Sequence, residues 1–259
     1  MKDETIRHKI IHKNQEWFSI CDSISGLIAK IVNSFDVPKH KIDLIFLTSL
    51  FGKIVNSYDS AIILIQNGYI QDSGTIIRSL MESIFVLKAC IDDDKYLNDY
   101  YRTDIADLNI FLKNQARYID DMKRKYPDVD ECLCNSLKEA NSQIEAYGEV
   151  SCVKYNALIA ANIAGLQNIY YSTYSLLSCI NAHPSPRAVF SRIEFDHAGY
   201  PSELKIGPET DSADRMLLLL VQLMIVALEC MDKKLETGLS SDIARVFALF
   251  REREKNICG

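Results

Sequence analysis

Apolar residues recur at intervals of three and four along most of the chain, and this spacing places them on one face of an α-helix. The clearest case is residues 69–90, in which Ile76, Leu80, Ile84 and Leu87 fall on one face. No stretch alternates apolar and polar residues for long enough to indicate a sheet. The pattern predicts an all-α protein, a helical bundle of about seven to eight helices with one long proline-containing loop.

The ends of the expected helices follow from glycine, proline and acidic residues. Pro38 ends a first long helix, and Gly68 and Gly238 are suited to the left-handed residue that closes a helix. The expected helices are 4–34 with a break near Asp22 or Gly26, about 39–67, 69–90, 94–125 after the acidic run 92–94, 127–147, 167–181, about 210–235, and a short one from 240. Between them, residues 184–208 predict a long loop with a short extended piece at Arg192–Phe195.

The length of 259 residues permits one large domain or two small ones. We expect a single all-helical domain over 1–259, with an N-terminal helix (1–36) as an addition, a core of about 39–237 and a C-terminal helix (240–259). The mostly apolar run Met216–Cys230 is interrupted by Gln222 and Glu229. Because it is shorter than the ~20 residues that a bilayer requires, we interpret it as a buried core helix.

Composition narrows the class of protein. Hydrophobic residues make up 48% of the chain and charged residues 25%, with only 10 Gly and 6 Pro, which is typical of a helical globular protein. The net charge of −6 argues against a broad nucleic-acid-binding surface, although a local basic site is compatible with it. Eight scattered cysteines and a polar N-terminus predict reduced thiols and a soluble, cytoplasmic protein that is not in a membrane.

Two charges interrupt the apolar helix at residues 69–90. Arg78 and Glu82 are four residues apart, so their side chains can meet on one face, and such residues are rarely buried without a partner. Later in the chain, Tyr174 and Ser178 lie one turn apart on one face, and His183 follows at the end of that helix. We therefore pair these two segments as the candidate functional site.

The pairing has two interpretations. In a site, His183 acts as acid or base, Glu82 fixes its tautomer and Arg78 holds an anionic oxygen through its guanidinium fork. In a structural network, the same side chains hold two helices in register. The residue types leave both interpretations open.

A metal site is a further alternative. His8 and His12 have a spacing that can place two ligands on one helix face, with Glu4 and Glu16 nearby as oxygen donors. A solvated helix face explains the same residues, and no third histidine accompanies them. Because the glycine-rich nucleotide-binding motifs and the nucleophile elbow are also missing from the sequence, we expect no metal and no cofactor.

Several of these residues carry a family resemblance. The segments Ala61–Gly68 and Ile76–Glu82, followed by Tyr174, Ser178 and His183, resemble a bacterial family of uncharacterised helical proteins. That family has an "LLRSLLE"-type helix and a later Y-x-x-L-S-x-x-x-H segment, whereas four residues separate serine from histidine here. The resemblance covers roughly residues 50–235 and extends, more distantly, to the HEPN group of helical-bundle nucleases found in toxin–antitoxin and phage-defence systems.

The HEPN resemblance implies metal-independent cleavage of RNA. HEPN nucleases use an R-x4-6-H motif, whose histidine is the acid or base and whose arginine supports the scissile phosphate; Arg192 and His197 have this spacing, within the expected loop. The charges within the apolar helix and the family resemblance together assign catalytic roles to Arg78, Glu82, Ser178 and His183. Tyr174, Arg192 and His197 are assigned to substrate binding, and Arg192 with His197 is also the alternative catalytic pair because of its spacing.

The resemblance also implies partners. HEPN-like proteins often form homodimers, and the apolar stretches Ile42–Phe51 and Met216–Leu228 are candidate interfaces, although burial within one chain explains them equally well. RNA is the expected substrate, and a protein partner of a defence or toxin system is a further expectation. The alternative is a non-catalytic helical protein-interaction module in which the Arg, Glu and His residues form a structural network.

Overall fold

The computed structural model describes residues 2–35, 39–125, 155–182 and 185–258, together with the single residues Asn135, Lys138 and Ser142. Contacts divide the chain into two compact units, the first formed by Met1–Asp92 with Ala157–Gly259 and the second by Asp93–Asn156. Apart from two short strands, the elements of the described residues are helical, which confirms the all-α prediction. The expectation of a single domain stays a prediction.

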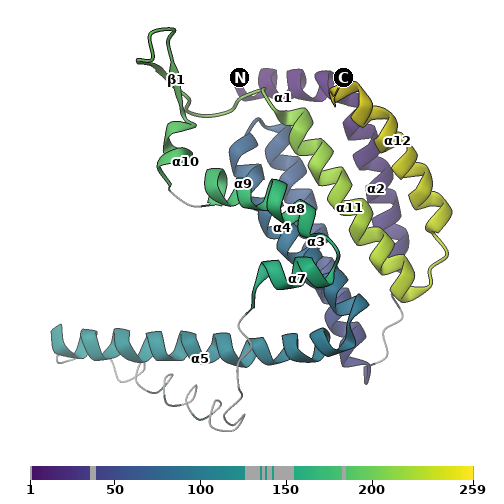
Figure 1. The fold of residues 1–259 in the computed structure, drawn as a ribbon, viewed down its shortest axis with the longest axis vertical. Helices are drawn as coiled ribbons and strands as arrows, with labels where there is room; N and C mark the ends of the chain where they lie inside the picture. Colours follow the sequence, from purple (N-terminus) through teal and green to yellow (C-terminus); the bar gives the residue numbers. More distant parts are fainter. Residues whose placement is uncertain are drawn as a thin grey trace. The chain divides into compact units, whose positions relative to one another are not determined.

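Most of the described residues of the first unit lie in helices (Figure 1). Its α-helices are α1 (Lys2–Lys13), α2 (Gln15–Asn33), α3 (Ile42–Gln66), α4 (Ile70–Asp92), α7 (Ala157–Ile163), α8 (Gln167–Ile169), α9 (Ser175–Leu177), α10 (Pro186–Phe190), α11 (Ala213–Leu235) and α12 (Ser240–Cys258). Two π-helical turns, η1 (Tyr170–Tyr174) and η2 (Ser178–Ala182), alternate with α8 and α9. The strands β1 (Ile193–Phe195) and β2 (Pro201–Leu204) pair as an antiparallel hairpin.

Helix α11 forms the centre of the core. It packs against α2, α3, α4 and α12 (Figure 1), and its side chains are buried on most sides. Leu217, Leu220, Val221 and Leu228, for example, are fully buried. A helix that is apolar nearly all round is stable in water only when neighbours cover it. The expectation of a buried core helix here is therefore confirmed.

Helices α3 and α4 form the antiparallel pair that positions the candidate site. Gly68 adopts a left-handed φ of 81° between them, a conformation that glycine allows without a side-chain clash. The inner face of α3 buries Phe51 and Tyr58, and the inner face of α4 buries Ile77 and Leu80. Because these faces fix the rotation of α4, its charged positions are directed away from the core.

The second unit is described chiefly by α5 (Asp94–Lys125). Asp93 precedes this helix, and its carboxylate accepts hydrogen bonds from the backbone N–H groups of Lys95 and Tyr96. This is the capping role expected of an acidic residue at a helix N-terminus. The expected helix at 127–147 lies outside the described residues, apart from the three single positions.

Three expectations about the elements were wrong in detail. The first long helix breaks at Asn14, not near Asp22 or Gly26. The Asn14 side-chain amide donates to the Ile10 carbonyl. Asparagine side chains often bond nearby backbone groups in this way and so compete with the hydrogen bonds of the helix. The final helix has 19 residues and is not short. The loop at 184–208 contains α10 and the hairpin, although the extended piece expected at Arg192–Phe195 is present as β1.

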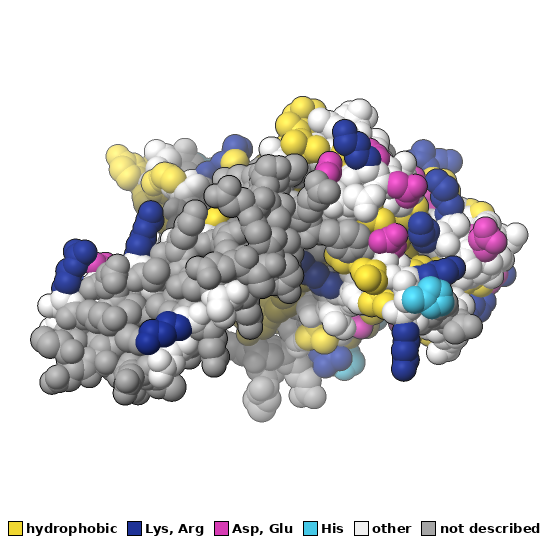
Figure 2. All heavy atoms as spheres, turned by 90° about the horizontal axis from the view of Figure 1, so that it is seen from below, with side chains coloured by type: hydrophobic (Ala, Val, Ile, Leu, Met, Phe, Trp, Pro, Cys, Tyr) yellow, Lys and Arg dark blue, Asp and Glu magenta, His cyan; other side chains and the backbone are white. Residues whose placement is uncertain are grey.

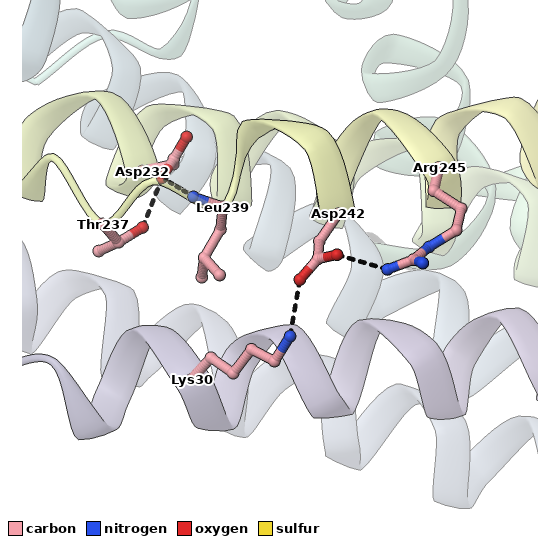
Figure 3. Close-up of polar contacts among 6 residues, drawn as sticks. All are labelled: Lys30, Asp232, Thr237, Leu239, Asp242 and Arg245. Atoms are coloured by element: carbon pink, nitrogen blue, oxygen red, sulfur yellow. Dashed lines mark hydrogen bonds and ion pairs between the residues drawn. The ribbon is translucent and has the colours of Figure 1, made fainter.

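A buried carboxylate closes the turn between α11 and α12. Asp232 is 6% exposed and accepts hydrogen bonds from Thr237 Oγ1, Ser240 Oγ and Leu239 N at 2.5, 2.6 and 2.8 Å (Figure 3 draws the first and third). Burial alone would raise the pKa of Asp232, but these hydrogen bonds and one from Gly238 N outweigh it and lower the pKa below its ordinary value. Asp232 is thus an ionised cap for the α11–α12 connection.

Helix α12 is held against α2 by an aromatic contact and by ion pairs, one of which joins Arg253 Nη1 to Glu16 Oε2 at 2.7 Å. The ring of Trp17, fully buried, lies edge-on to Phe250 with centroids 6.2 Å apart. On the surface, Lys30 Nζ is 2.6 Å from Asp242 Oδ2, and Arg245 contacts the other oxygen of the same carboxylate (Figure 3). Because exposed ion pairs contribute little, the aromatic contact supplies most of the stabilisation.

Replacing Asp232 by Asn should destabilise the protein by about 1–3 kcal/mol near neutral pH, because an amide supplies fewer acceptors and no charge. A carboxylate with a lowered folded-state pKa stabilises the fold above its unfolded pKa and loses that effect as the pH falls through the folded pKa. The gap between wild type and Asp232→Asn in urea denaturation should therefore shrink below about pH 4.

Asp22, an exposed residue of α2, provides the matched control. Asp22→Asn should change the free energy of unfolding by less than about 0.5 kcal/mol at every pH. A constant gap between wild type and Asp232→Asn from pH 7 to pH 3 would contradict the ionised-cap assignment.

Candidate functional site

The outward face of α4 carries an ion pair. Arg78 Nη2 lies 3.2 Å from Glu82 Oε1, one helical turn away, and the two side chains are 21% and 27% exposed. Their neighbours Leu80 and Met81 are fully buried. The ion pair therefore stands at the boundary between the core and the surface, where a charge is partly desolvated.

The segment facing this pair is the mixed helix from α8 to η2. Tyr174 and Ser178 lie one turn apart on it and both contact Arg78. Arg78 Nε donates to Ser178 Oγ at 2.8 Å, and Arg78 Nη2 donates to the Tyr174 hydroxyl at 2.8 Å. Tyr174 in turn donates to Glu82 Oε1 at 2.5 Å. The structure thus brings together Arg78, Glu82, Tyr174 and Ser178, which we call the Arg78 cluster.

The Tyr174 phenol is the link that both charges share. Its side chain is buried, and burial together with the hydrogen bond and negative charge of Glu82 raises the pKa of Tyr174 to about 12. The phenol is therefore protonated at neutral pH and donates to Glu82 while it accepts from Arg78. Tyr174 can orient the two charged groups but is a poor general base at this pH.

Two aromatic rings pack against the Tyr174 ring of the cluster. The Tyr174 and Tyr170 rings stack with centroids 4.9 Å apart, and the buried Phe85 ring meets Tyr174 edge-on at 6.0 Å. The Arg78 guanidinium carbon lies 4.8 Å from the centre of the Tyr174 ring, within the range of a cation–π contact. These contacts hold the guanidinium plane in a fixed orientation.

One edge of the Arg78 guanidinium takes no part in these bonds. The contacts within the cluster use Nε and Nη2, and among the described residues no hydrogen bond reaches Nη1. Glu82 Oε2 is likewise outside the hydrogen bonds that the described residues make. Since both side chains are partly exposed, the cluster presents one donor edge and one acceptor oxygen to a ligand.

The cluster includes one residue from each π-helical turn, and α9 separates the two turns. Tyr174 is the last residue of η1 and Ser178 is the first of η2, whereas the sequence predicted a regular helix over residues 167–181. π-helical turns are rare and frequently accompany functional sites. Apolar periodicity gives no signal for them, because it registers which face is buried and not the hydrogen-bond pattern.

Sequence reasoning missed Asn181, which fixes η2 on α4. Its Nδ2 donates to the Gln71 carbonyl at 2.7 Å, and its own carbonyl accepts from Thr75 Oγ1 at 3.1 Å. Gly74 makes this approach possible, because a Cβ built there would lie 2.7 Å from Asn181 Nδ2. A glycine inside an apolar helix pattern was the available signal, since it marks close packing.

The other predicted site residues are not joined to the cluster. His183 lies outside the described residues. Arg192 directly precedes β1, and His197 is exposed in the turn between β1 and β2; among the described residues no contact connects either of them to the Arg78 cluster. A second pair with the R-x4-H spacing, Arg7 and His12, was also missed and lies exposed on α1.

The remaining candidates concern metals, membranes and interfaces. His8 and His12 are exposed on α1, and nowhere in the described ranges do three His, Cys, Asp or Glu side chains gather as a metal site. Within those ranges no helix has the length and apolar character needed to cross a membrane. The Met216–Leu228 stretch is largely buried in the first unit, so the core accounts for its apolar character.

Gly74→Ala should lower the stability of the protein by about 1 kcal/mol, because the new methyl group displaces the Asn181 amide from the Gln71 carbonyl. Gly52→Ala is the matched control: Gly52 also lies inside a helix, but nothing is within 4 Å of a Cβ there. That change should raise stability by about 0.5–1 kcal/mol through helix propensity.

A double-mutant cycle tests the cause. In an Asn181→Ala background the obstacle is gone, so Gly74→Ala should become neutral or stabilising by thermal or urea denaturation. Equal destabilisation by Gly74→Ala in both backgrounds would show that Asn181 is not the group it displaces.

Comparison with known proteins identifies a family. No curated protein and no solved structure matches the chain. A family of unknown function (DUF5677) matches residues 44–200, which is more than half of the chain and includes the whole Arg78 cluster and β1, but ends before β2. The expectation of an uncharacterised family is thereby confirmed. The chain belongs to the DUF5677 family of unknown function.

Proposed function

We propose that the protein binds RNA at the Arg78 cluster and cleaves it without a metal ion, in a bacterial toxin or phage-defence system. The observation that carries the proposal is the bonding of Arg78: three neighbours fix its guanidinium, and its Nη1 makes no hydrogen bond to any of the described residues. An arginine oriented in advance by its surroundings is suited to a phosphate oxygen, because little conformational freedom is lost on binding.

The roles of the other residues follow from their bonds. Glu82 and Ser178 hold Arg78, and Tyr174 relays between the two charges. His183, five positions after Ser178 in the sequence, is the proposed acid and base. It would take the proton of the RNA 2′-hydroxyl as that oxygen attacks the phosphate, and give a proton to the 5′-oxygen as the P–O5′ bond breaks, which leaves a 2′,3′-cyclic phosphate and a 5′-hydroxyl. Arg78 would support the negative charge that develops on the phosphate.

The electrostatics of the chain favour a small contact with RNA. The net charge is −6, and on the face drawn in Figure 2 Lys and Arg side chains are interspersed with Asp and Glu. Sequence-independent binding of RNA usually requires a broad basic surface, and a net charge of −6 does not favour one. Recognition would therefore rest on one or two phosphates and on base stacking, for which the exposed ring of Tyr171 beside the cluster is suited.

The test is cleavage of labelled RNA by the purified full-length protein in the presence of EDTA. His183→Ala should lower the rate by about 10²–10⁴-fold, the contribution of a general acid–base. Arg78→Lys should lower it as well, since lysine keeps the charge but loses the fork. Replacing the 2′-hydroxyl at the cleaved position by hydrogen should abolish cleavage by the wild type.

Two exposed residues serve as controls. His40→Ala and Arg215→Ala change the same residue types outside the cluster and should leave the rate unchanged. Full cleavage activity in His183→Ala, with the thermal melt intact, would remove His183 from the mechanism and the nuclease proposal with it.

A second candidate is a non-catalytic interaction module in which the Arg78 cluster is a structural clasp. The observation that favours it is that Glu82 already neutralises Arg78 within the chain. Every contact of the cluster also joins α4 to the η1–η2 segment or lies within α4. Removing Arg78 would then leave the Glu82 carboxylate without its positive partner, bonded only to the Tyr174 hydroxyl among these residues.

Tyr174→Phe separates the two candidates, because it deletes only the shared hydroxyl and keeps the stacked ring. The clasp predicts a loss of about 1–2 kcal/mol in unfolding free energy, with no change in any RNA cleavage rate per folded molecule. The nuclease site predicts a reduced rate as well. Tyr171→Phe, on the exposed neighbouring ring, is the control and should leave stability unchanged within about 0.5 kcal/mol.

A further inference from the structure

The β1–β2 hairpin is amphipathic, and its apolar face is exposed. Ile193 is paired with Leu204 in the register, and Glu194 with Glu203, so the two pairs lie on opposite faces. Phe195 shares the apolar face by alternation along β1. Phe195 is 49% exposed and Leu204 is 58% exposed. The face that would normally pack on a core is therefore open.

The exposed apolar surface continues beyond the strands. Ile206 follows Leu204 at a spacing of two and is 82% exposed, and Tyr200 in the turn is 69% exposed. Figure 1 shows the hairpin projecting from the helices of the first unit. Four large apolar side chains are thus exposed within one short segment, and exposed apolar patches of this kind mark interaction sites. A two-stranded hairpin is also only marginally stable by itself and gains from further strands.

Within the part of the chain that the structure describes, β2 pairs with β1 alone, so its other edge has no partner strand. The Lys205 N–H donates to the Arg192 carbonyl, so the backbone groups of Lys205, and by alternation those of Glu203, point toward β1. The N–H and C=O of Leu204 therefore point to the outer edge. All four residues of β2 are exposed, and its outer edge can accept another strand.

The charged face of the hairpin is unbalanced within one chain. Lys205 Nζ bonds Glu194 at 3.0 Å, but Glu203 lies directly opposite Glu194, a like-charge pair that is unfavourable. Among the described residues, no cation lies within ion-pair distance of Glu203. Glu203 thus lacks the partner that a neighbouring strand would provide.

We infer that this hairpin pairs with the same hairpin of a second copy of the chain, β2 against β2 in antiparallel orientation about Leu204. The outward backbone groups of the two Leu204 residues then bond each other, and the two hairpins form one four-stranded sheet. Glu203 of each copy stands opposite Lys205 of the other, on the charged face. The apolar faces of both hairpins lie on one side of that sheet and form a continuous surface.

Charge selects this register over its neighbours. A symmetric pairing shifted by one residue toward the start of β2 places Glu203 opposite Glu203, and a shift the other way places Lys205 opposite Lys205. Both put like charges directly across the strands, which is destabilising. Larger shifts bring Pro201 or Pro208 into the pairing, and proline cannot donate to it. The charge complementarity thus belongs to a two-fold arrangement, the form that most dimers take.

The test is the dimer dissociation constant of the full chain, measured by analytical ultracentrifugation over a range of concentrations. Wild type should dimerise, and Glu203→Lys should weaken the dimer about tenfold or more, because the new lysine faces Lys205 of the other copy. Within one chain the same change improves the hairpin, since the new lysine faces Glu194. A weaker dimer in this variant would therefore not be explained by a less stable hairpin.

The rescue variant carries Glu203→Lys and Lys205→Glu together, which restores opposite charges across the two copies and should recover the wild-type dissociation constant. Glu252→Lys, an exposed change on α12, is the matched control and should leave association unaltered. A monomeric wild type overturns the inference. A dimer that Glu203→Lys does not weaken, or that the double change does not restore, overturns it too.

Discussion

A half-buried arginine sets the constraint on which this part of the structure depends. Arg78 stands where the buried face of α4 meets the surface, and a charge in that position is costly without partners. Its own helix supplies only Glu82, so the remaining hydrogen bonds must come from a second segment. That requirement explains why the η1–η2 segment lies against α4 with Tyr174 and Ser178 directed at the guanidinium.

The close approach of the two segments has its own physical conditions. Gly74 removes the side chain that would collide with Asn181, and the Asn181 amide then bonds the α4 backbone. The π-helical turns end and begin at the two residues that bind Arg78. The departure from α-helical geometry and the Arg78 cluster therefore coincide: the π-helical turns occur at the residues whose side chains bind the guanidinium.

Much of the helical framework was predictable, because α4 and α5 have apolar periodicity, α11 is a long and mostly apolar run, and Gly68 is a clear end signal for α3. The spacing of four residues also brought Arg78 and Glu82 into one candidate with Tyr174 and Ser178. Two kinds of feature were missed. One depends on contacts between residues far apart in the sequence, such as the bond of Asn181 to the Gln71 carbonyl. The other depends on a side chain that bonds the helix backbone, as at the Asn14 break, which the spacing of apolar residues does not register. Of the hairpin, the extended piece that became β1 was expected, whereas its partner β2 was missed because four residues are too few to show an alternating pattern.

Arg78 needs a negative partner because it is partly buried, whereas binding a phosphate requires that its positive charge remain available. Glu82 lowers the cost of holding Arg78 at the core boundary, but it also reduces the positive charge available to a phosphate. The Tyr174 phenol moderates this conflict, because it donates to the same carboxylate oxygen that contacts Arg78 and so withdraws part of its negative charge. A phosphate that displaced Glu82 from Arg78 would find the guanidinium still held by Ser178 and by the Tyr174 ring. The geometry is thus compatible with exchange of one anion for another without loss of the arginine's orientation.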